Sequence, residues 1–335
     1  MVSFKKKYKA DSCVRYNKAW HKNTGIPLEW MKDAGHNSGL TSRSLWTASL
    51  QSWLRDAMTK KNYDRWVLRM IYNEVVKYYE NYREEDRITT NNARKIEFLT
   101  TIRKFDEVFK EKYEILDCAA GTGAYAFYLA DKGHKLTATD ITPRHISYID
   151  EHLKEKPYSM ETKVLDATDM YCFQDASFDV VLNMGPFYHL IDKKARKKCL
   201  DESLRVLKKG GYFVVAYIPR LYLNQMIAML DVKYVDEQLL SQIKTTGVLK
   251  HNDPNCFWTD TYYSSYDEMQ ELFRDNNLDV VMHFAQDGMS PLFHNTVDMW
   301  NDEQFDTWLA YHLSVCAEKT IIDMSNHVVI IGKKN

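Results

Sequence analysis

Apolar residues fall in short uninterrupted runs between residues 113 and 218, and the stretches between these runs carry apolar positions three or four residues apart. The short runs have the length of buried strands, and the longer stretches have the helical period. The runs predict five strands, at residues 115–116, 136–140, 163–165, 178–182 and 212–218. Strands that alternate with helices are typical of a parallel α/β sheet.

The same patterns continue on both sides of this region. They predict helices at residues 75–87, 93–112, 266–274 and 302–317, a sixth strand at residues 278–284, and a seventh at residues 327–331 closed by Gly332. Residues 221–248 have a helical pattern, and a dense aromatic stretch follows them. Because residues 221–263 are too long for an ordinary crossover, we expect them to form a cap insertion.

A run of small residues follows the first strand and its closing acid, Asp117. It reads A-A-G-T-G from Ala119 to Gly123, and a helical pattern begins directly after it. Glycines allow the backbone to bend sharply and to approach a ligand closely, while a helix N-terminus presents unpaired N–H groups. The second strand ends in Asp140, where a carboxylate can accept both hydroxyls of a ribose. This arrangement indicates a nucleotide-binding crossover.

Five motifs occur in the order of the predicted strands. They are D-x-x-x-G-x-G from Asp117, the strand-end acid Asp140, D-A-x-x-M from Asp166, S-F-D-V-V from Ser177 and L-K-x-G-G from Leu207. Together they resemble the class I S-adenosylmethionine-dependent methyltransferases of small-molecule type, over residues 71–335. The resemblance implies an α/β, Rossmann-like fold with a seven-stranded, mostly parallel sheet whose last strand runs antiparallel between the fifth and sixth. A helical N-terminal extension and the cap complete the expected fold.

The resemblance also implies S-adenosylmethionine as the cofactor and S-adenosylhomocysteine as the product left behind. Asp117 and the loop backbone would border the methionine part, with contacts at Ala119, Gly121 and Gly123. Asp140 would bind the ribose hydroxyls. The chain departs from the family at Ala119, where the family often has glycine, and alanine does not adopt a positive φ at low cost.

The adenine and the sulfonium are expected at the ends of the next strands. By resemblance, Ile141 would flank the adenine, and Asp166, beside Ala167, would accept a hydrogen bond from the adenine amino group. Asn183 and Met184 would line the floor below the sulfonium.

The helix predicted at residues 75–87 carries tyrosines and charges. As a lid over the cofactor, it would bring Tyr79 or Arg87 to the methionine carboxylate. The alternative is an amphipathic helix that packs through its tyrosines and leaves its charges in solvent.

His189 and Tyr188 are the candidate catalytic residues. They follow the fourth strand, where this fold presents groups to the methyl acceptor. A histidine with a pKa near neutrality is able to remove a proton from the acceptor. A packed histidine is the alternative.

Composition indicates a globular protein, with 45% hydrophobic and 27% charged residues. No apolar run follows the Lys-rich N-terminus and none approaches the length of a membrane span, so we expect no secretory signal and no membrane association. The six cysteines are scattered without a C-x-x-C pair. This spacing predicts neither a metal site nor a disulfide framework, and it favours a cytoplasmic location.

Residues 1–69 differ from the remainder in charge. They carry fourteen Lys and Arg against five acidic residues, a net charge of +9, whereas residues 70–335 carry 31 basic and 41 acidic residues, a net charge of −10. Five of the eight tryptophans also lie in the first segment. We therefore predict a basic, Trp-rich accessory or fusion segment at residues 1–69 and a methyltransferase domain at residues 70–335.

The predicted function is methyl transfer to a small organic acceptor, because an aromatic cap follows the fifth strand. One alternative is an RNA or DNA methyltransferase that binds nucleic acid through residues 1–69. A second alternative is a non-catalytic module that binds S-adenosylmethionine. A dehydrogenase is disfavoured because Ala126 stands where the last glycine of G-x-G-x-x-G would be.

Overall fold

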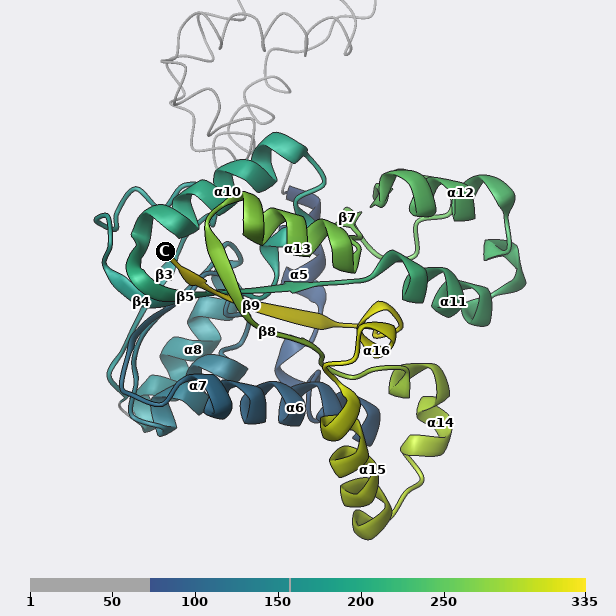
Figure 1. The fold of residues 1–335 in the computed structure, drawn as a ribbon, viewed down its shortest axis with the longest axis horizontal. Coiled ribbons are helices and arrows are strands. Elements are labelled where there is room, and N and C mark those ends of the chain that lie inside the picture. The colour runs from purple at the N-terminus through teal and green to yellow at the C-terminus, as the bar shows by residue number, and fades with distance from the viewer. Residues whose placement is uncertain (1–72, 157) are drawn as a thin grey trace, which may run out of the picture. The chain divides into compact units, whose positions relative to one another are not determined.

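A seven-stranded sheet organises the part of the chain that this computed structural model describes, residues 73–156 and 158–335 (Figure 1). Its strand order is β3-β2-β1-β4-β5-β9-β8. The ladders are parallel from β3 to β5, whereas β9 is antiparallel to both of its neighbours, β5 and β8. The predicted fold class and the antiparallel last strand are confirmed. The segment predicted at residues 1–69 lies outside the described residues, and its boundary stays a prediction.

The strands of this sheet are β1 Glu114–Asp117, β2 Lys135–Asp140, β3 Met160–Val164, β4 Phe178–Asn183, β5 Leu207–Tyr217, β8 Leu278–Ala285 and β9 Val328–Lys334. The centre of the sheet is covered on both faces, and Figure 1 shows α6, α7 and α8 on one side with α10 and α13 on the other. Val180, Val181 and Leu182 of β4 are accordingly fully buried. Burial on both faces explains why this strand reads as a continuous apolar run in the sequence.

Strand β3 begins at Met160, three residues before the predicted start. Two further strand boundaries differ from the prediction, and glycine is involved in both. Strand β5 begins at Leu207, five residues early, because Leu207 pairs with Phe178. Gly211 lies so close to β4 that a Cβ on it would be 2.6 Å from the Asp179 carbonyl oxygen. The expectation that Gly332 closes the last strand is wrong, since β9 continues to Lys334. Gly332 instead allows the Phe273 ring to approach the backbone of β9, because a Cβ there would lie 2.6 Å from that ring.

The helices flank the sheet or extend it. They are α5 Asn73–Asn81, α6 Asn92–Val108, α7 Ala124–Asp131, α8 Pro143–Glu155, α9 Pro186–His189, α10 Lys193–Val206, α11 Arg220–Leu230, α12 Glu237–Thr246, α13 Tyr266–Asp275, α14 His294–Val297, α15 Asp302–Val315 and α16 Lys319–Asp323. Short 3₁₀ turns are η1 Glu84–Asp86, η2 Val232–Tyr234 and η3 Ser290–Phe293. Local sequence begins several helices: the Asn91 side chain caps α6, and Ser265 with Glu268 forms a capping box on α13.

The helix predicted at residues 75–87 is shorter than expected. It ends at Asn81, and η1 follows after a short break. The Arg144 guanidinium donates to the Tyr82 carbonyl oxygen at 2.6 Å. That contact with α8 gives the carbonyl a partner outside any helix, so the chain turns instead of continuing the helical ladder.

The predicted cap contains α11, η2, α12 and a small ribbon of β6 Val248–Leu249 and β7 Thr261–Tyr262. The helical pattern of residues 221–248 is interrupted at two aspartates. Asp231 and Asp236 accept hydrogen bonds from the backbone N–H groups of Lys233 (3.0 Å) and Leu239 (2.8 Å), and each one begins a new helical turn. The cap follows directly from the carboxyl end of β5, where a site of this fold is expected (Figure 1).

No helix within residues 73–156 and 158–335 combines the length and the apolar character needed to cross a bilayer.

Candidate active site

The loop between β1 and α7 has the backbone geometry that its glycines predict. Gly121 has φ +55° and Gly123 has φ +88°, both in the left-handed region that favours glycine. A Cβ on Gly123 would lie 2.9 Å from the Phe127 ring and 3.0 Å from Ile149. Glycine at this position is therefore required both by the backbone conformation and by the packing of α7 and α8. Ala119 lies in the same loop and is half-buried.

Asp140 connects this loop to the end of β2. Its Oδ2 accepts from the Gly121 N–H at 3.0 Å, and its Oδ1 accepts from the Thr142 N–H at 2.7 Å. The carboxylate is buried, and backbone groups on two sides fix its orientation. Each oxygen keeps a further lone pair, so Asp140 is suited to accept hydroxyl donors beside the loop.

Asp117 lies at the end of β1 with one oxygen, Oδ1, that has no hydrogen-bond partner among the described residues. Burial raises the pKa of Asp117 to about 7, with the Ala119 N–H opposing the rise and the charge of Asp140 adding to it. A buried acceptor without a partner is costly, and a ligand donor would relieve that cost. Asp117 and Asp140 therefore fit a ligand that has ammonium and hydroxyl donors, as S-adenosylmethionine has.

The residues predicted for the adenine lie at the ends of β2 and β3. Asp166 Oδ1 accepts from the Thr168 N–H at 2.8 Å, and burial raises the pKa of its carboxyl. Ala167 beside it is buried, and Ile141 is half-buried directly after β2. Parallel strands end at the same edge of the sheet, so these residues share that edge with Asp140.

Asn183 and Met184 lie at the end of β4 and point to different surroundings. The Asn183 amide donates to Cys199 Sγ at 3.0 Å, so this fully buried side chain faces α10. The Met184 carbonyl accepts from the Tyr188 hydroxyl at 3.0 Å. Of the two, Met184 therefore has the direct link to the predicted acceptor side.

A cavity of about 430 Å³ lies between α5, α6, α9 and the cap. One part of its wall is aromatic, with Tyr78, Tyr79, Tyr82, Tyr188 and Trp258. Another part is charged or polar, with Glu84, Arg87, Arg94, Glu97, Asp287 and His327. Three predicted site residues, Tyr79, Arg87 and Tyr188, are thus brought to one cavity.

His189 lies behind this wall and is nearly buried. Its Nε2 is 3.0 Å from the Tyr79 hydroxyl, and its Nδ1 is 3.3 Å from the Asp260 carbonyl oxygen. Burial lowers the pKa of His189 to about 4, although the Asp260 carbonyl opposes the change. The pKa of His189 therefore lies below the neutral range, because the imidazole is desolvated beside the rings of Tyr79 and Trp258.

Arg87 is held by carboxylates in the cavity wall. Its Nη1 and Nη2 donate to the two oxygens of Glu97 at 2.7 and 3.0 Å, and its Nε donates to Glu84 at 2.7 Å. Burial raises the pKa of Glu97, but the charges of Arg87 and His327 outweigh it and bring the pKa to about 2. Arg87 is thus part of an ion-pair network before any ligand arrives.

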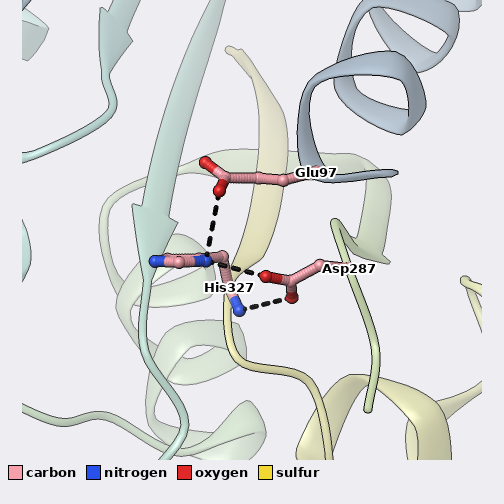
Figure 2. Close-up of side chains that lie close together, drawn as sticks. All are labelled: Glu97, Asp287 and His327. Atoms are coloured by element: carbon pink, nitrogen blue, oxygen red, sulfur yellow. Dashed lines mark hydrogen bonds and ion pairs between the residues drawn. The ribbon is translucent and has the colours of Figure 1, made fainter. Parts of the chain in front are cut away.

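Figure 2 shows how Glu97 and Asp287 converge on His327. The His327 Nδ1 lies 2.9 Å from Asp287 Oδ2 and 3.6 Å from Glu97 Oε2. Burial lowers the pKa of His327, but the two carboxylates outweigh it, and the net pKa is raised. The three ligand atoms lie within 4.8 Å of one another, as in a divalent-metal site. Because Arg87 already supplies positive charge beside Glu97, and the two carboxylates favour the protonated form of His327, the geometry favours an ion-pair network over a metal.

Sequence reasoning did not find this network. Arg87 was a predicted site residue, but Glu97, Asp287 and His327 lie on α6, after β8 and before β9, and no spacing in the sequence connects them. Trp258 had a signal, the dense aromatic stretch of the cap, but nothing in the sequence placed it in the wall of the cavity.

Comparisons with known proteins agree with the fold and the loop. Residues 116–215 match the family described as "Methyltransferase domain". A ubiquinone biosynthesis O-methyltransferase of Xylella fastidiosa (strain M23) is 29% identical over 121 residues, which cover 36% of this chain and 48% of that protein. A glycine/sarcosine N-methyltransferase of Parasynechococcus marenigrum is 27% identical over 102 residues, covering 30% of this chain and 36% of the relative.

The chain spans about half the length of the ubiquinone biosynthesis O-methyltransferases that it matches. A solved structure from Pyrococcus horikoshii OT3 superposes with a TM-score of 0.50 at 16% identity, covering 77% of this chain and 99% of that chain. At that identity the likeness concerns the fold alone. Residues 116–215, from β1 into β5, therefore match a methyltransferase domain, and with the geometry of the loop they resemble the class I S-adenosylmethionine-dependent methyltransferases.

Proposed function

We propose that the protein transfers a methyl group from S-adenosylmethionine to a small organic acceptor bound in the 430 Å³ cavity. The observation that carries this proposal is that the cavity wall meets the cofactor loop. A Cβ on Gly121 would lie 3.5 Å from the Cγ of Glu84, which lines the cavity. On the other side, a Cβ on Gly185 would lie 3.3 Å from Ala119 and 3.8 Å from the Tyr188 hydroxyl. A methyl donor in the loop and an acceptor in the cavity would therefore be neighbours.

The size and lining of the cavity support a small acceptor. Pockets for small organic ligands usually have volumes of about 300–1,000 Å³ and combine aromatic walls with a few polar groups. The curated relatives named above, an O-methyltransferase of ubiquinone biosynthesis and a glycine/sarcosine N-methyltransferase, also favour a small acceptor. The nucleic-acid alternative depends on residues 1–69, which lie outside the described residues.

When bound, S-adenosylmethionine supplies a methyl group on a sulfonium that is already activated for displacement. The task left to the chain is to hold the two reactants in line and to exclude water, and such positioning contributes a large share of the barrier reduction. In this proposal Asp140 and the loop backbone hold the donor. Tyr78, Tyr188 and Trp258 hold the acceptor.

Asp140→Ala is expected to weaken S-adenosylhomocysteine binding by about 1–3 kcal/mol, because a charged acceptor of hydrogen bonds is removed. Isothermal titration calorimetry measures this change. Glu151→Ala, at an exposed position on α8, is the control and should bind like the parent. Equal affinity in the Asp140→Ala and parent proteins would remove Asp140 from the cofactor site.

Trp258→Ala is expected to lower methyl transfer about tenfold at subsaturating acceptor, because a large ring leaves the cavity wall. The assay supplies S-adenosylmethionine with a labelled methyl group and measures label in a metabolite extract and, separately, in RNA. Met229→Ala, at an exposed position of the cap, is the matched control. Label that appears in RNA and not in the metabolite fraction would contradict the small-molecule proposal.

A further inference from the structure

Three groups form a hydrogen-bonded chain at the cavity wall: the Asp260 carbonyl, the His189 imidazole and the Tyr79 hydroxyl. Neighbouring contacts hold two of these groups in place. The buried Asp260 carboxylate accepts from the His251 N–H at 2.7 Å, which fixes the residue whose carbonyl faces His189. The Trp258 ring packs edge-on against the imidazole with centroids 5.0 Å apart.

The direction of each hydrogen bond follows from the chemistry of its partner. A carbonyl oxygen only accepts, so His189 Nδ1 must carry a proton. Because burial lowers the pKa of His189 to about 4, the ring is neutral near pH 7 and its Nε2 has no proton. The Tyr79 hydroxyl must then be the donor in its 3.0 Å contact with Nε2.

Tyr79 therefore has no proton to offer the cavity that it lines. Its oxygen keeps lone pairs and acts toward the cavity only as an acceptor. Tyr188, also in the wall, is in the same situation because its hydroxyl donates to the Met184 carbonyl. Two phenol oxygens that only accept are complementary to a ligand that donates.

We infer that the methyl acceptor is a hydroxyl compound whose O–H donates to Tyr79, and that its proton passes through Tyr79 to His189. The inference rests on the proposed function and names the class of substrate. As the acceptor oxygen bonds to the methyl carbon, the carbon–sulfur bond breaks and its electron pair stays on sulfur. The acceptor proton moves to Tyr79 Oη, and the original Tyr79 proton moves to His189 Nε2. The imidazolium later returns that proton to solvent through the same path.

The hydrogen-bonded chain from Tyr79 to His189 distinguishes a hydroxyl acceptor from an amine, because it offers a route for a proton that only the hydroxyl must lose. An oxygen that gains a methyl group while keeping its proton becomes an oxonium, a far stronger acid than imidazolium, so even a weak base removes the proton. An amine gains the methyl group as an ammonium ion, which is stable with its proton and needs no base in the site. In this scheme Tyr79 is the catalytic residue, and His189 is a positioning residue that acts through it.

The first test compares phenol with fluorobenzene, a ring of similar size that has no donor. Ligand-observed NMR measures the binding of each to protein saturated with S-adenosylhomocysteine. Phenol is expected to bind about fivefold more tightly to the parent, as one net hydrogen bond allows. Tyr79→Phe should reduce the difference to less than twofold. Tyr82→Phe is the matched control in the same wall and should keep the difference, because its hydroxyl accepts from Arg94 instead.

The second test reads the tautomer of His189 directly, by nitrogen NMR of histidine-labelled protein at pH 7, with the signal assigned by its loss in His189→Gln. A neutral ring protonated on Nδ1 is expected, and Tyr79→Phe should shift the Nε2 resonance. A ring protonated on Nε2, or a charged ring, would overturn the inference even if the Tyr79→Phe variant does not fold. Equal binding of phenol and fluorobenzene by the folded parent would also overturn it. A parent protein that does not bind S-adenosylhomocysteine, or that transfers no labelled methyl group, would instead refute the proposed function.

Discussion

Arg87→Leu is expected to lower the free energy of unfolding by about 3–5 kcal/mol, because removing one partner of a buried ion pair leaves an uncompensated charge. Glu97 is 5% exposed, and both of its oxygens accept from Arg87. Without Arg87, the ion-pair partner left to the carboxylate among the described residues would be His327, whose Nδ1 is 3.6 Å away. Urea unfolding followed by circular dichroism measures the loss.

Two further variants make the Arg87 prediction specific. Arg83→Leu removes an exposed arginine of the same segment and should change stability by less than about 1 kcal/mol. Arg87→Leu combined with Glu97→Leu removes both charges and should recover more than half of the loss. If the double variant is as unstable as the single one, the buried charge of Glu97 is not the cause.

The same pair gives the parent protein a dependence on pH. The pKa of Glu97 is about 2 in the folded protein, below the ordinary value of 4.5. A lowered carboxyl pKa contributes stability that is complete above about pH 4.5 and is lost as the pH falls toward 2, by about 3 kcal/mol in all. In Arg87→Leu this contribution should disappear between pH 4.5 and 2, because burial is then no longer opposed by Arg87.

Gly123→Ala is expected to destabilise the protein by about 2–4 kcal/mol and to abolish most of its affinity for S-adenosylhomocysteine. The residue has φ +88°, and a Cβ would lie 2.9 Å from Phe127 and 3.0 Å from Ile149. Left-handed strain costs about 1–2 kcal/mol and overpacking adds about 1–3 kcal/mol. Thermal unfolding and calorimetry with S-adenosylhomocysteine measure the two effects.

The chain offers a matched control for this substitution. Gly210 also has a positive φ, +76°, but a Cβ there would meet nothing within 4 Å. Gly210→Ala should therefore show the strain alone, at about 1–2 kcal/mol, with unchanged ligand affinity. Equal effects at both glycines would mean that contact with α7 and α8 does not matter.

The strands and the glycine turn proposed to hold the cofactor were predictable from the sequence because their determinants are local. An apolar run, a strand-end acid and a glycine turn lie within a few residues of one another, and the pattern that they make predicts β1, β2 and the place of Asp140. The cavity that we propose for the acceptor was not predictable in this way. Its wall joins Tyr79, Trp258 and His327, and their proximity depends on tertiary packing between segments far apart in the chain.

His189 shows a different limit of sequence reasoning. Its place after β4 was predicted, but its chemistry depends on burial and on the Asp260 carbonyl, a backbone atom that no side-chain pattern reveals. The end of the first helix was missed for a similar reason. Arg144, on α8, binds the Tyr82 carbonyl, and this contact between two separate elements overrides the local helical pattern.

The place of β9 in the sheet imposes an order on folding. Strand β8 precedes β9 in the sequence. In the described sheet, however, β8 pairs with β9 alone. Until β9 has paired with β5, β8 has no strand to dock on, and the apolar edge of β5 that includes Val214 and Val215 stays uncovered. Pairing of strands so distant in sequence closes a long loop, which is slow. Insertion of β9 is therefore the expected late step of folding, and the uncovered β5 edge is where an incompletely folded chain would associate with another.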